Sequence, residues 1–334
     1  MTAILVTGGA GYIGSHACKA LAAAGFVPVT YDNLSTGHAY AVKWGPFVQG
    51  ELFDQVKLEE TMQKFQPMAV LHFAASALVV ESMHSPELYY KNNVSATLSL
   101  LEVMRRNGIL KLVFSSTCAT YGNPVKLPIT EDHPQAPINP YGRTKWMIEQ
   151  MLVDFGQAYG LQSAVLRYFN AAGADGEVGE NHTPETHLLP SIIHAAMGLR
   201  PEVVVYGTAF PTADGSAVRD YIHVSDLADA HVLALKKLLS DNENVVLNLG
   251  TGKGCSVLEL IEAVEKFSGK KVALRREAAR GGEPHTLCAD GSRARSVLGW
   301  NPSRSEIGTI VETAWKWHTL LSELKPLVQR LVPS

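Results

Sequence analysis

The start of the chain constrains the fold most, because a short apolar run leads directly into a glycine-rich turn. Residues 4–7 read Ile-Leu-Val-Thr, and residues 8–16 read Gly-Gly-Ala-Gly-Tyr-Ile-Gly-Ser-His. The apolar run predicts a buried parallel strand, and glycines three residues apart permit a tight turn and the close approach of a pyrophosphate. A helix expected after the turn offers unpaired N–H groups to that anion. The pattern predicts a dinucleotide-binding turn.

A second short strand, at residues 27–31, ends in Asp32. A carboxylate in this position accepts hydrogen bonds from the ribose hydroxyls of adenosine and repels a 2′-phosphate, which favours NAD over NADP. The turn-like residues 33–37 would then lie along the adenosine. Another strand, residues 47–52, carries Glu51 near its end. Glu51 is either a contact to the adenine amino group or a solvated loop acid, and the sequence leaves both open.

Composition indicates a protein that binds a small molecule or another subunit. The 334 residues are 46% apolar, which is enough for a large core in one domain or two intimate ones. A net charge of -3 provides no basic surplus for nucleic acid or an anionic membrane. The four cysteines show no CxxC spacing, and no apolar run reaches the length of a membrane span. We therefore expect an unanchored, cytoplasmic protein.

Polar groups follow the later strands of the first half. The strand at residues 69–75 runs into small side chains that would let a cofactor lie flat, and His72 inside it is expected to be a packed core histidine. A long amphipathic helix is expected at residues 86–106. The strand at residues 111–114 ends in the hydroxyls of residues 115–117, which would face the ligand crevice. Cys118 beside them is expected to be a buried thiol.

A candidate acid/base pair lies at the start of the next helix. Asn139 and Pro140 are typical of a helix start, and Tyr141 and Lys145 then share one helix face. A phenol has a pKa near 10, and an ammonium within about 6 Å would lower it. Oxidised nicotinamide adds another positive charge. Tyr141 could then accept a hydroxyl proton while hydride leaves the same carbon.

The second half changes character after a further strand at residues 162–166. Residues 170–186 predict a long substrate-enclosing loop, and shorter helices and strands follow as a smaller α/β lobe, interleaved with the first domain. We place the two units at residues 1–170 and 171–334. Arg219 and Arg280 are candidates for binding a diphosphate, although Arg219 could instead pair with Asp220 and Arg280 follows other arginines. We find no cluster with metal-ligand spacing, so no metal site is expected.

The chain resembles the extended short-chain dehydrogenase/reductases and, within them, the UDP-glucose (UDP-galactose) 4-epimerases. The resemblance covers nearly the full length and is carried by residues 8–16, 31–34, 72–74, 89–94, 115–117, 141–145, 166–170 and 218–224. It implies a doubly wound parallel Rossmann sheet with a smaller C-terminal α/β substrate lobe, tightly held NAD and a homodimer. In that dimer, residues 86–106 and 141–159 would form a four-helix bundle.

The resemblance also implies the site residues. Catalytic roles fall on Tyr141, Lys145 and Thr117, with Tyr141 as the base and Thr117 bonding the sugar oxygen at C4. The implied cofactor contacts are Gly8, Gly11, Tyr12, Ile13, Gly14, Asp32, Asn33, Leu34, Ser35, Thr36, Gly37, Glu51, Leu52, Phe73, Ala74, Ala75, Asn92, Ser115, Tyr141, Lys145 and Phe169. The implied UDP-sugar contacts are Thr117, Tyr141, Asn170, Leu188, Arg219, Arg280 and Leu287.

Several positions depart from the best-known pattern of the 4-epimerases. Ala77 stands where some members have a lysine near the cofactor, Glu51 replaces an aspartate, Thr117 a serine and His187 an asparagine. Leu287 stands where a bulkier tyrosine narrows the sugar pocket in some members, so the pocket could admit the N-acetyl group of UDP-GlcNAc. The pentose pair UDP-xylose and UDP-arabinose stays open. A 4,6-dehydratase is disfavoured because no acidic pair follows Thr117.

A different class of function is a regulator that binds NAD and catalyses nothing. Such a protein can keep the glycine turn and lose the Tyr/Lys pair, whereas this chain has both. The sequence therefore favours an enzyme.

Overall fold

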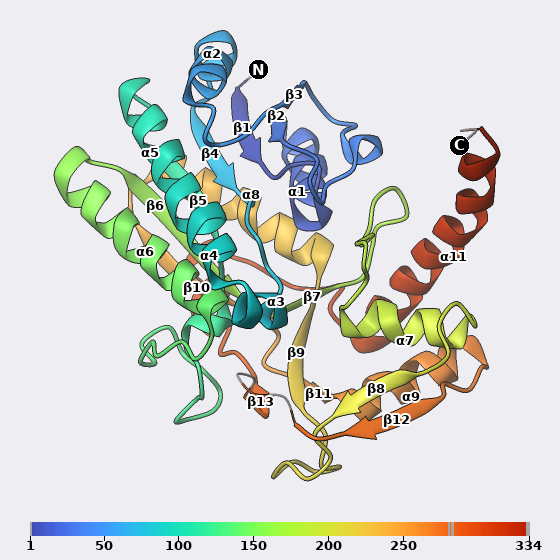
Figure 1. Cartoon of the computed structure of the whole chain (residues 1–334). Helices are drawn as coiled ribbons and strands as arrows, with labels where there is room; N and C mark the ends of the chain where they lie inside the picture. Colours follow the sequence, from blue (N-terminus) through green and yellow to red (C-terminus); the bar gives the residue numbers. More distant parts are fainter. Residues whose placement is uncertain (1, 280, 282–283, 332–334) are drawn as a thin grey trace.

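A seven-stranded parallel sheet is the centre of the structure (Figure 1). The computed structural model describes residues 2–279, 281 and 284–331, with side chains up to residue 323, so Arg280 lies outside the described residues. The strand order is β10-β6-β5-β4-β1-β2-β3, and every neighbouring pair is parallel. The strands are β1 (Ala3–Thr7), β2 (Val27–Asp32), β3 (Phe47–Gln49), β4 (Ala69–His72), β5 (Lys111–Thr117), β6 (Gln162–Tyr168) and β10 (Val245–Leu249).

Helices cover both faces of this sheet, because its central strands are apolar on both faces. In β1, Ile4 and Val6 are buried in one core cluster and Leu5 in another. The first cluster includes residues of α1 (Tyr12–Ala23), α8 (Val224–Ser240) and α10 (Ser292–Leu298). The second includes residues of α2 (Gln55–Phe65), α5 (Ala96–Arg106) and α6 (Pro140–Tyr159). The predicted doubly wound Rossmann architecture is confirmed.

Smaller mixed sheets form the rest of the molecule. One contains β7 (Asn170–Ala172), β9 (Val218–His223), β11 (Gly254–Ser256) and β13 (Thr286–Leu287), and β8 (Val203–Tyr206) pairs with β12 (Leu274–Glu277). They pack with α7 (Leu188–Ala196), α9 (Val257–Ser268) and α11 (Ile307–Leu331) around a separate core. α8 and β10 come from the second half of the chain but join the large sheet, and the division at residue 170 remains a prediction. None of the described helices could span a membrane.

The predicted helix at residues 86–106 is present, with a wider turn inside it. The chain passes from α4 (Pro86–Tyr89) through a π-helical segment, Tyr90–Ser95, into α5. Asn93 of this segment is fully buried, and its side-chain oxygen accepts a bond from Ser76 N at 2.8 Å. Its amide nitrogen donates to Ser76 O at 3.0 Å and to Thr144 Oγ1 at 3.1 Å. Asn93 thus ties the loop after β4 to α6.

α6 begins as predicted. The Asn139 side chain accepts a bond from Gly142 N at 2.8 Å, Pro140 is the first helical residue, and Gly160 ends the helix at φ +75°. Gly142 lies so close to the end of β5 that a Cβ there would be 2.4 Å from Ala119 O. The first turn of α6 is therefore pressed against the carboxyl end of β5.

A buried ion pair fixes α6 to the sheet. Glu149 of α6 accepts bonds from Arg167 of β6, with Arg167 Nε 3.0 Å and Arg167 Nη2 2.5 Å from its two oxygens. It also accepts bonds from Ser116 Oγ at 2.5 Å and Gln135 Nε2 at 2.9 Å. Arg167 also donates to Tyr121 Oη at 2.9 Å. Both charged groups are almost fully buried, so each depends on the other.

We predict that Glu149→Gln lowers the free energy of unfolding by about 3–5 kcal/mol, because it leaves a buried guanidinium without its counter-charge. Urea denaturation of both proteins measures the difference. The control is Glu312→Gln, which breaks the exposed pair with Lys316 and should change the value by about 0.5 kcal/mol or less. A loss below about 1 kcal/mol for Glu149→Gln would contradict the assigned role.

Candidate functional site

A large cleft opens at the carboxyl ends of the parallel strands, where open α/β sheets bind their ligands. Its volume is about 1220 Å³, and residues of the smaller sheets complete its wall. Every predicted site residue lines it except Arg280, which lies outside the described residues. These residues are Gly8, Gly11, Tyr12, Ile13, Gly14, Asp32, Asn33, Leu34, Ser35, Thr36, Gly37, Glu51, Leu52, Phe73, Ala74, Ala75, Asn92, Ser115, Thr117, Tyr141, Lys145, Phe169, Asn170, Leu188, Arg219 and Leu287.

The glycine turn can accept only glycine at two positions. Gly8 has φ +74°, and a Cβ there would lie 2.5 Å from Ala74 N. A Cβ on Gly14 would lie 2.1 Å from Gly8 O. α1 begins just after Gly11, and no described side chain caps it. Its first N–H groups are thus left for a ligand, which suits the diphosphate of a dinucleotide.

Asp32 is held rigidly at the end of β2. Its carboxylate accepts bonds from Ala10 N at 3.0 Å and Leu34 N at 2.8 Å. Burial raises the pKa of Asp32, and these two bonds act against that effect. The turn and this carboxylate together fit NAD. Glu51 is exposed and accepts two bonds from the Asn33 amide, at 3.1 and 3.2 Å, so its contact to adenine stays a prediction.

The predicted acid/base residues meet at the end of β5. The hydroxyl of Thr117 lies beside the phenol of Tyr141, close enough to stabilise its ionised form. Lys145 lies one helical turn further along α6, where its Nζ donates to Ser115 O at 2.8 Å and lies 4.9 Å from the centre of the Phe114 ring. The two hydroxyls and the amine therefore face the cleft from adjoining elements.

The electrostatics of this group differ from the sequence-based expectation. Burial raises the pKa of Tyr141 to about 12, although the neighbouring Thr117 hydroxyl favours the phenolate. Burial also lowers the pKa of Lys145 to about 7, so near neutral pH the amine is only partly charged. The prediction that Lys145 lowers the pKa of Tyr141 is thus wrong for the protein chain alone. Desolvation is the largest cause at both groups, and Lys145 is not among the groups that shift the pKa of Tyr141.

Two residues that sequence analysis assigned to the core lie there. His72 is buried between the hydroxyls of Thr7 and Thr97, at 2.7 and 2.8 Å. Burial lowers the pKa of His72 to about 3, so it is neutral. Burial raises the pKa of Cys118 to about 12, which keeps it a thiol.

In the second half, the structure answers one open question about Arg219. Its guanidinium donates to Val218 O at 2.9 Å and His285 O at 3.3 Å. Asp220 is fully buried and accepts bonds from Thr251 and other residues instead, so the two do not form the surface pair considered above. Leu287 is buried in the same small apolar cluster as Phe169. Arg219 and Leu287 thus belong to the cleft wall.

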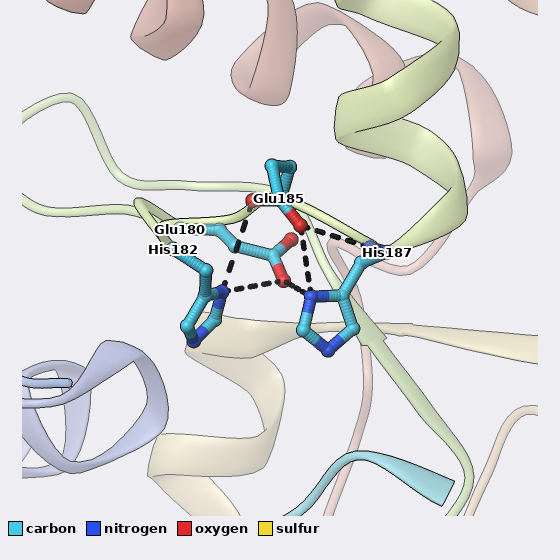
Figure 2. Close-up of side chains that lie close together, drawn as sticks. All are labelled: Glu180, His182, Glu185 and His187. Atoms are coloured by element: carbon cyan, nitrogen blue, oxygen red, sulfur yellow. Dashed lines mark hydrogen bonds and ion pairs between the residues drawn. The ribbon is translucent and has the colours of Figure 1, made fainter. Parts of the chain in front are cut away.

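The expectation that the chain contains no cluster of metal-ligating type is wrong. Glu180, His182, Glu185 and His187 come together in the cleft wall, as Figure 2 shows. Against the effect of burial, the carboxylates raise the pKa of His182 to about 9 and that of His187 to about 10. The signal in the sequence was the pattern Glu-x-His-x-x-Glu-x-His over residues 180–187. Sequence analysis treats residues 180–186 as part of an enclosing loop and His187 only as a departure from a family asparagine, so it does not recognise the cluster.

Comparisons with known proteins agree with this site. Residues 4–250 match the NAD dependent epimerase/dehydratase family. The chain is 53% identical to a UDP-glucose 4-epimerase of Rhizobium meliloti over 318 residues, covering 95% of this chain and 97% of that one. A crystal structure of the UDP-glucose 4-epimerase from Brucella ovis in complex with NAD is 51% identical, with a TM-score of 0.92 over 94% of this chain and 98% of that chain.

A third similar protein was solved with a sugar nucleotide. It is the UDP-glucose 4-epimerase of Stenotrophomonas maltophila with bound NAD and formylated UDP-arabinopyranose. It is 42% identical, with a TM-score of 0.93 over 97% of this chain and 99% of that chain. The coverage extends over nearly the full length of the chain, and the chain belongs to the NAD dependent epimerase/dehydratase family.

Proposed function

We propose that this protein interconverts UDP-glucose and UDP-galactose by 4-epimerisation with bound NAD. The observation that carries the proposal is that Thr117 and Tyr141 lie together in the same cleft as the uncapped start of α1. The similar proteins named above are UDP-glucose 4-epimerases. Arg219 and the first turn of α1 both bring positive charge to the cleft, which suits the diphosphates of a dinucleotide and a UDP-sugar.

The residues of the cleft divide the chemistry between them. NAD, when bound, supplies the hydride acceptor and a positive charge. Thr117 bonds the oxygen at C4 of the sugar, and Tyr141 takes the hydroxyl proton as the C4–H bond breaks and the 4-keto sugar forms. After the sugar rotates, hydride returns to its other face and Tyr141 returns the proton to the oxygen. Oxidation and reduction cancel, so one turnover leaves the cofactor unchanged.

The high pKa of Tyr141 in the chain alone fits this division. A buried phenol resists ionisation until positive charge lies beside it. The Lys145 amine is held on Ser115 O, next to the end of β5, where it supports the charge that the cofactor brings. Proton transfer is thereby confined to the protein with both ligands bound.

Three alternatives differ in the substrate or the class of function. UDP-GlcNAc with UDP-GalNAc, or UDP-xylose with UDP-arabinose, would use the same proton and hydride transfers on another sugar. A regulator that binds NAD without turnover would need the glycine turn and Asp32 but would not need Tyr141 as a general base. The Thr117–Tyr141 pair favours an enzyme over the regulator.

Tyr141→Phe tests the catalytic proposal. We predict that it lowers kcat by about 10³-fold or more, since the general base is lost while the cleft keeps its shape. The assay follows conversion of UDP-galactose to UDP-glucose without added cofactor. Tyr159→Phe, at the far end of the same helix and outside the cleft, is the matched control and should keep the parent rate, since phenylalanine keeps the apolar ring. A Tyr141→Phe protein as fast as the parent would refute the proposed mechanism.

Leu287→Tyr tests sugar specificity. Leu287 is a small side chain in the buried wall beside Phe169, and a phenol ring there would fill space needed by an N-acetyl group. If the protein turns over UDP-GlcNAc, we predict that Leu287→Tyr lowers kcat/KM for it at least about 10-fold more than for UDP-glucose. Equal losses for both substrates would place the N-acetyl group elsewhere. Absence of UDP-GlcNAc turnover in the parent would dismiss the N-acetyl alternative.

We also propose a cytoplasmic homodimer. α4, α5 and α6 lie side by side in Figure 1 and expose large apolar side chains, namely Leu88, Leu98, Val153 and Tyr159. A second copy would cover them as a four-helix bundle.

Sedimentation at micromolar concentration should give about twice the chain mass of 36.2 kDa. Val153→Glu should shift the protein toward the monomer because it places a charge in the bundle. Val56→Glu, on exposed α2, should leave the mass unchanged. A parent that sediments as a monomer would contradict the dimer.

A further inference from the structure

The loop between β7 and α7 carries two histidines and two glutamates that converge on one point. One potential ligand atom from each of Glu180, His182, Glu185 and His187 lies within 4.8 Å of all the others (Figure 2). The catalytic scheme above uses none of them. Their convergence therefore needs its own explanation.

The distances in the cluster are within about half an ångström of the edges of a coordination tetrahedron. His187 Nδ1 lies 2.9 Å from Glu180 Oε1 and 3.0 Å from Glu185 Oε1. His182 Nδ1 lies 3.4 Å from Glu180 Oε1 and 3.8 Å from Glu185 Oε2. Nitrogen and oxygen ligands about 2.0–2.2 Å from a tetrahedral Zn²⁺ are about 3.3–3.6 Å apart. Of the four observed distances, two are shorter than this range, one lies within it and one is longer, and Glu185 faces the two histidines with different oxygens.

Hydrogen bonds satisfy the cluster incompletely. Within the described part of the chain, His182 Nδ1 and Glu185 Oε2 are buried atoms that have no hydrogen-bond partner, and only the longer ion pairs of His182 Nδ1 with Glu180 and Glu185 reach them. They lie 3.8 Å apart, too far for a hydrogen bond, yet both point into the cluster. Buried polar atoms without partners are rare and usually mark an ion or water that satisfies them.

The surroundings hold the cluster firmly and leave it accessible. Glu180 is buried, and its carbonyl accepts a bond from Trp317 Nε1 at 2.9 Å. The carbonyl of Asn181 is 2.7 Å from His38 Nε2. His187 immediately precedes α7, and its N–H donates to Glu185 Oε1 at 2.9 Å. All four residues line the cleft, which gives an ion a path of entry.

We propose that Glu180, His182, Glu185 and His187 form a tetrahedral site for a divalent transition metal of the Zn²⁺ type. Two imidazole and two carboxylate ligands suit Zn²⁺ better than Ca²⁺ or Mg²⁺, which take more oxygen ligands. The ion braces the loop that covers the cleft against the start of α7. The site does not depend on the proposed epimerase activity, because its ligands take no part in proton or hydride transfer.

A competing account needs no metal. Two imidazolium ions neutralised by two carboxylates would hold the same four side chains together as ion pairs. This account predicts that the protein does not bind Zn²⁺ at the cluster. The two accounts therefore differ in metal stoichiometry rather than in activity.

The direct test is metal binding by the untagged full-length protein. The protein is treated with a chelator, incubated with one equivalent of ZnCl₂, separated from free metal and analysed for zinc by mass spectrometry. We expect about one zinc per chain, and visible absorption of tetrahedral Co²⁺ when Co²⁺ replaces zinc. Failure to retain zinc would overturn the proposal, whatever the epimerase assay shows.

Variants then locate the ion. Glu180→Gln and His182→Gln should each weaken zinc binding at least about 100-fold, since each removes one ligand. His84→Gln, an exposed histidine outside the cluster and the cleft, is the matched control and should bind zinc as the parent does. Zinc retained equally by the parent and by the variant carrying both ligand substitutions would place the ion elsewhere and overturn the proposal.

Discussion

The packing of the first turn of α6 on the carboxyl end of β5 is the constraint on which the site depends. Gly142 allows the contact because any side chain would meet Ala119 O. The same contact brings Tyr141 to Thr117 and lets Lys145 reach Ser115 O. Burial then raises the pKa of the phenol and lowers the pKa of the amine. One packing event thus determines both the geometry and the electrostatics of the candidate site.

This arrangement makes Tyr141 a poor base when no cofactor is bound. A phenol with a pKa near 12 stays protonated at neutral pH, and positive charge beside it is needed to release the proton. The buried pair of Glu149 and Arg167 keeps α6 in register with β5 and β6, so the phenol cannot relax toward water. Rigidity and desolvation together link proton transfer to the presence of the cofactor.

Much of the fold could be predicted from local patterns. The glycine turn and the Asn139 cap lie where the sequence places them, because each depends on neighbours in the chain. The π-helical turn at Asn93 was not predicted, since it depends on bonds to Ser76 and Thr144 from distant segments. The ends of strands also differ from the prediction for the same reason. β4 ends at His72, three residues before the predicted strand end.

The candidate site also combines features that local sequence predicts with features that depend on distant contacts. Residues that line the cleft followed from motifs and family resemblance, whereas the direction of the Tyr141 pKa did not. Helix spacing predicts that Tyr141 and Lys145 share a helix face. It does not predict that the Lys145 amine donates to Ser115 O beside the apolar ring of Phe114. The Glu/His cluster was missed because its members become neighbours only through the folding of an irregular loop. Desolvation and loop closure are properties of the whole fold.

Positive charge in the cleft lowers the raised pKa of the Tyr141 phenol, so that the phenol can act as a base. The most direct measurement is the tyrosinate absorbance of Tyr141 against pH, taken as the difference between the parent and Tyr141→Phe, for nucleotide-free protein and for protein saturated with NAD⁺. We predict an ionisation near pH 12 without nucleotide and at least ~2 pH units lower with it. The same ionisation pH in both forms would contradict the account.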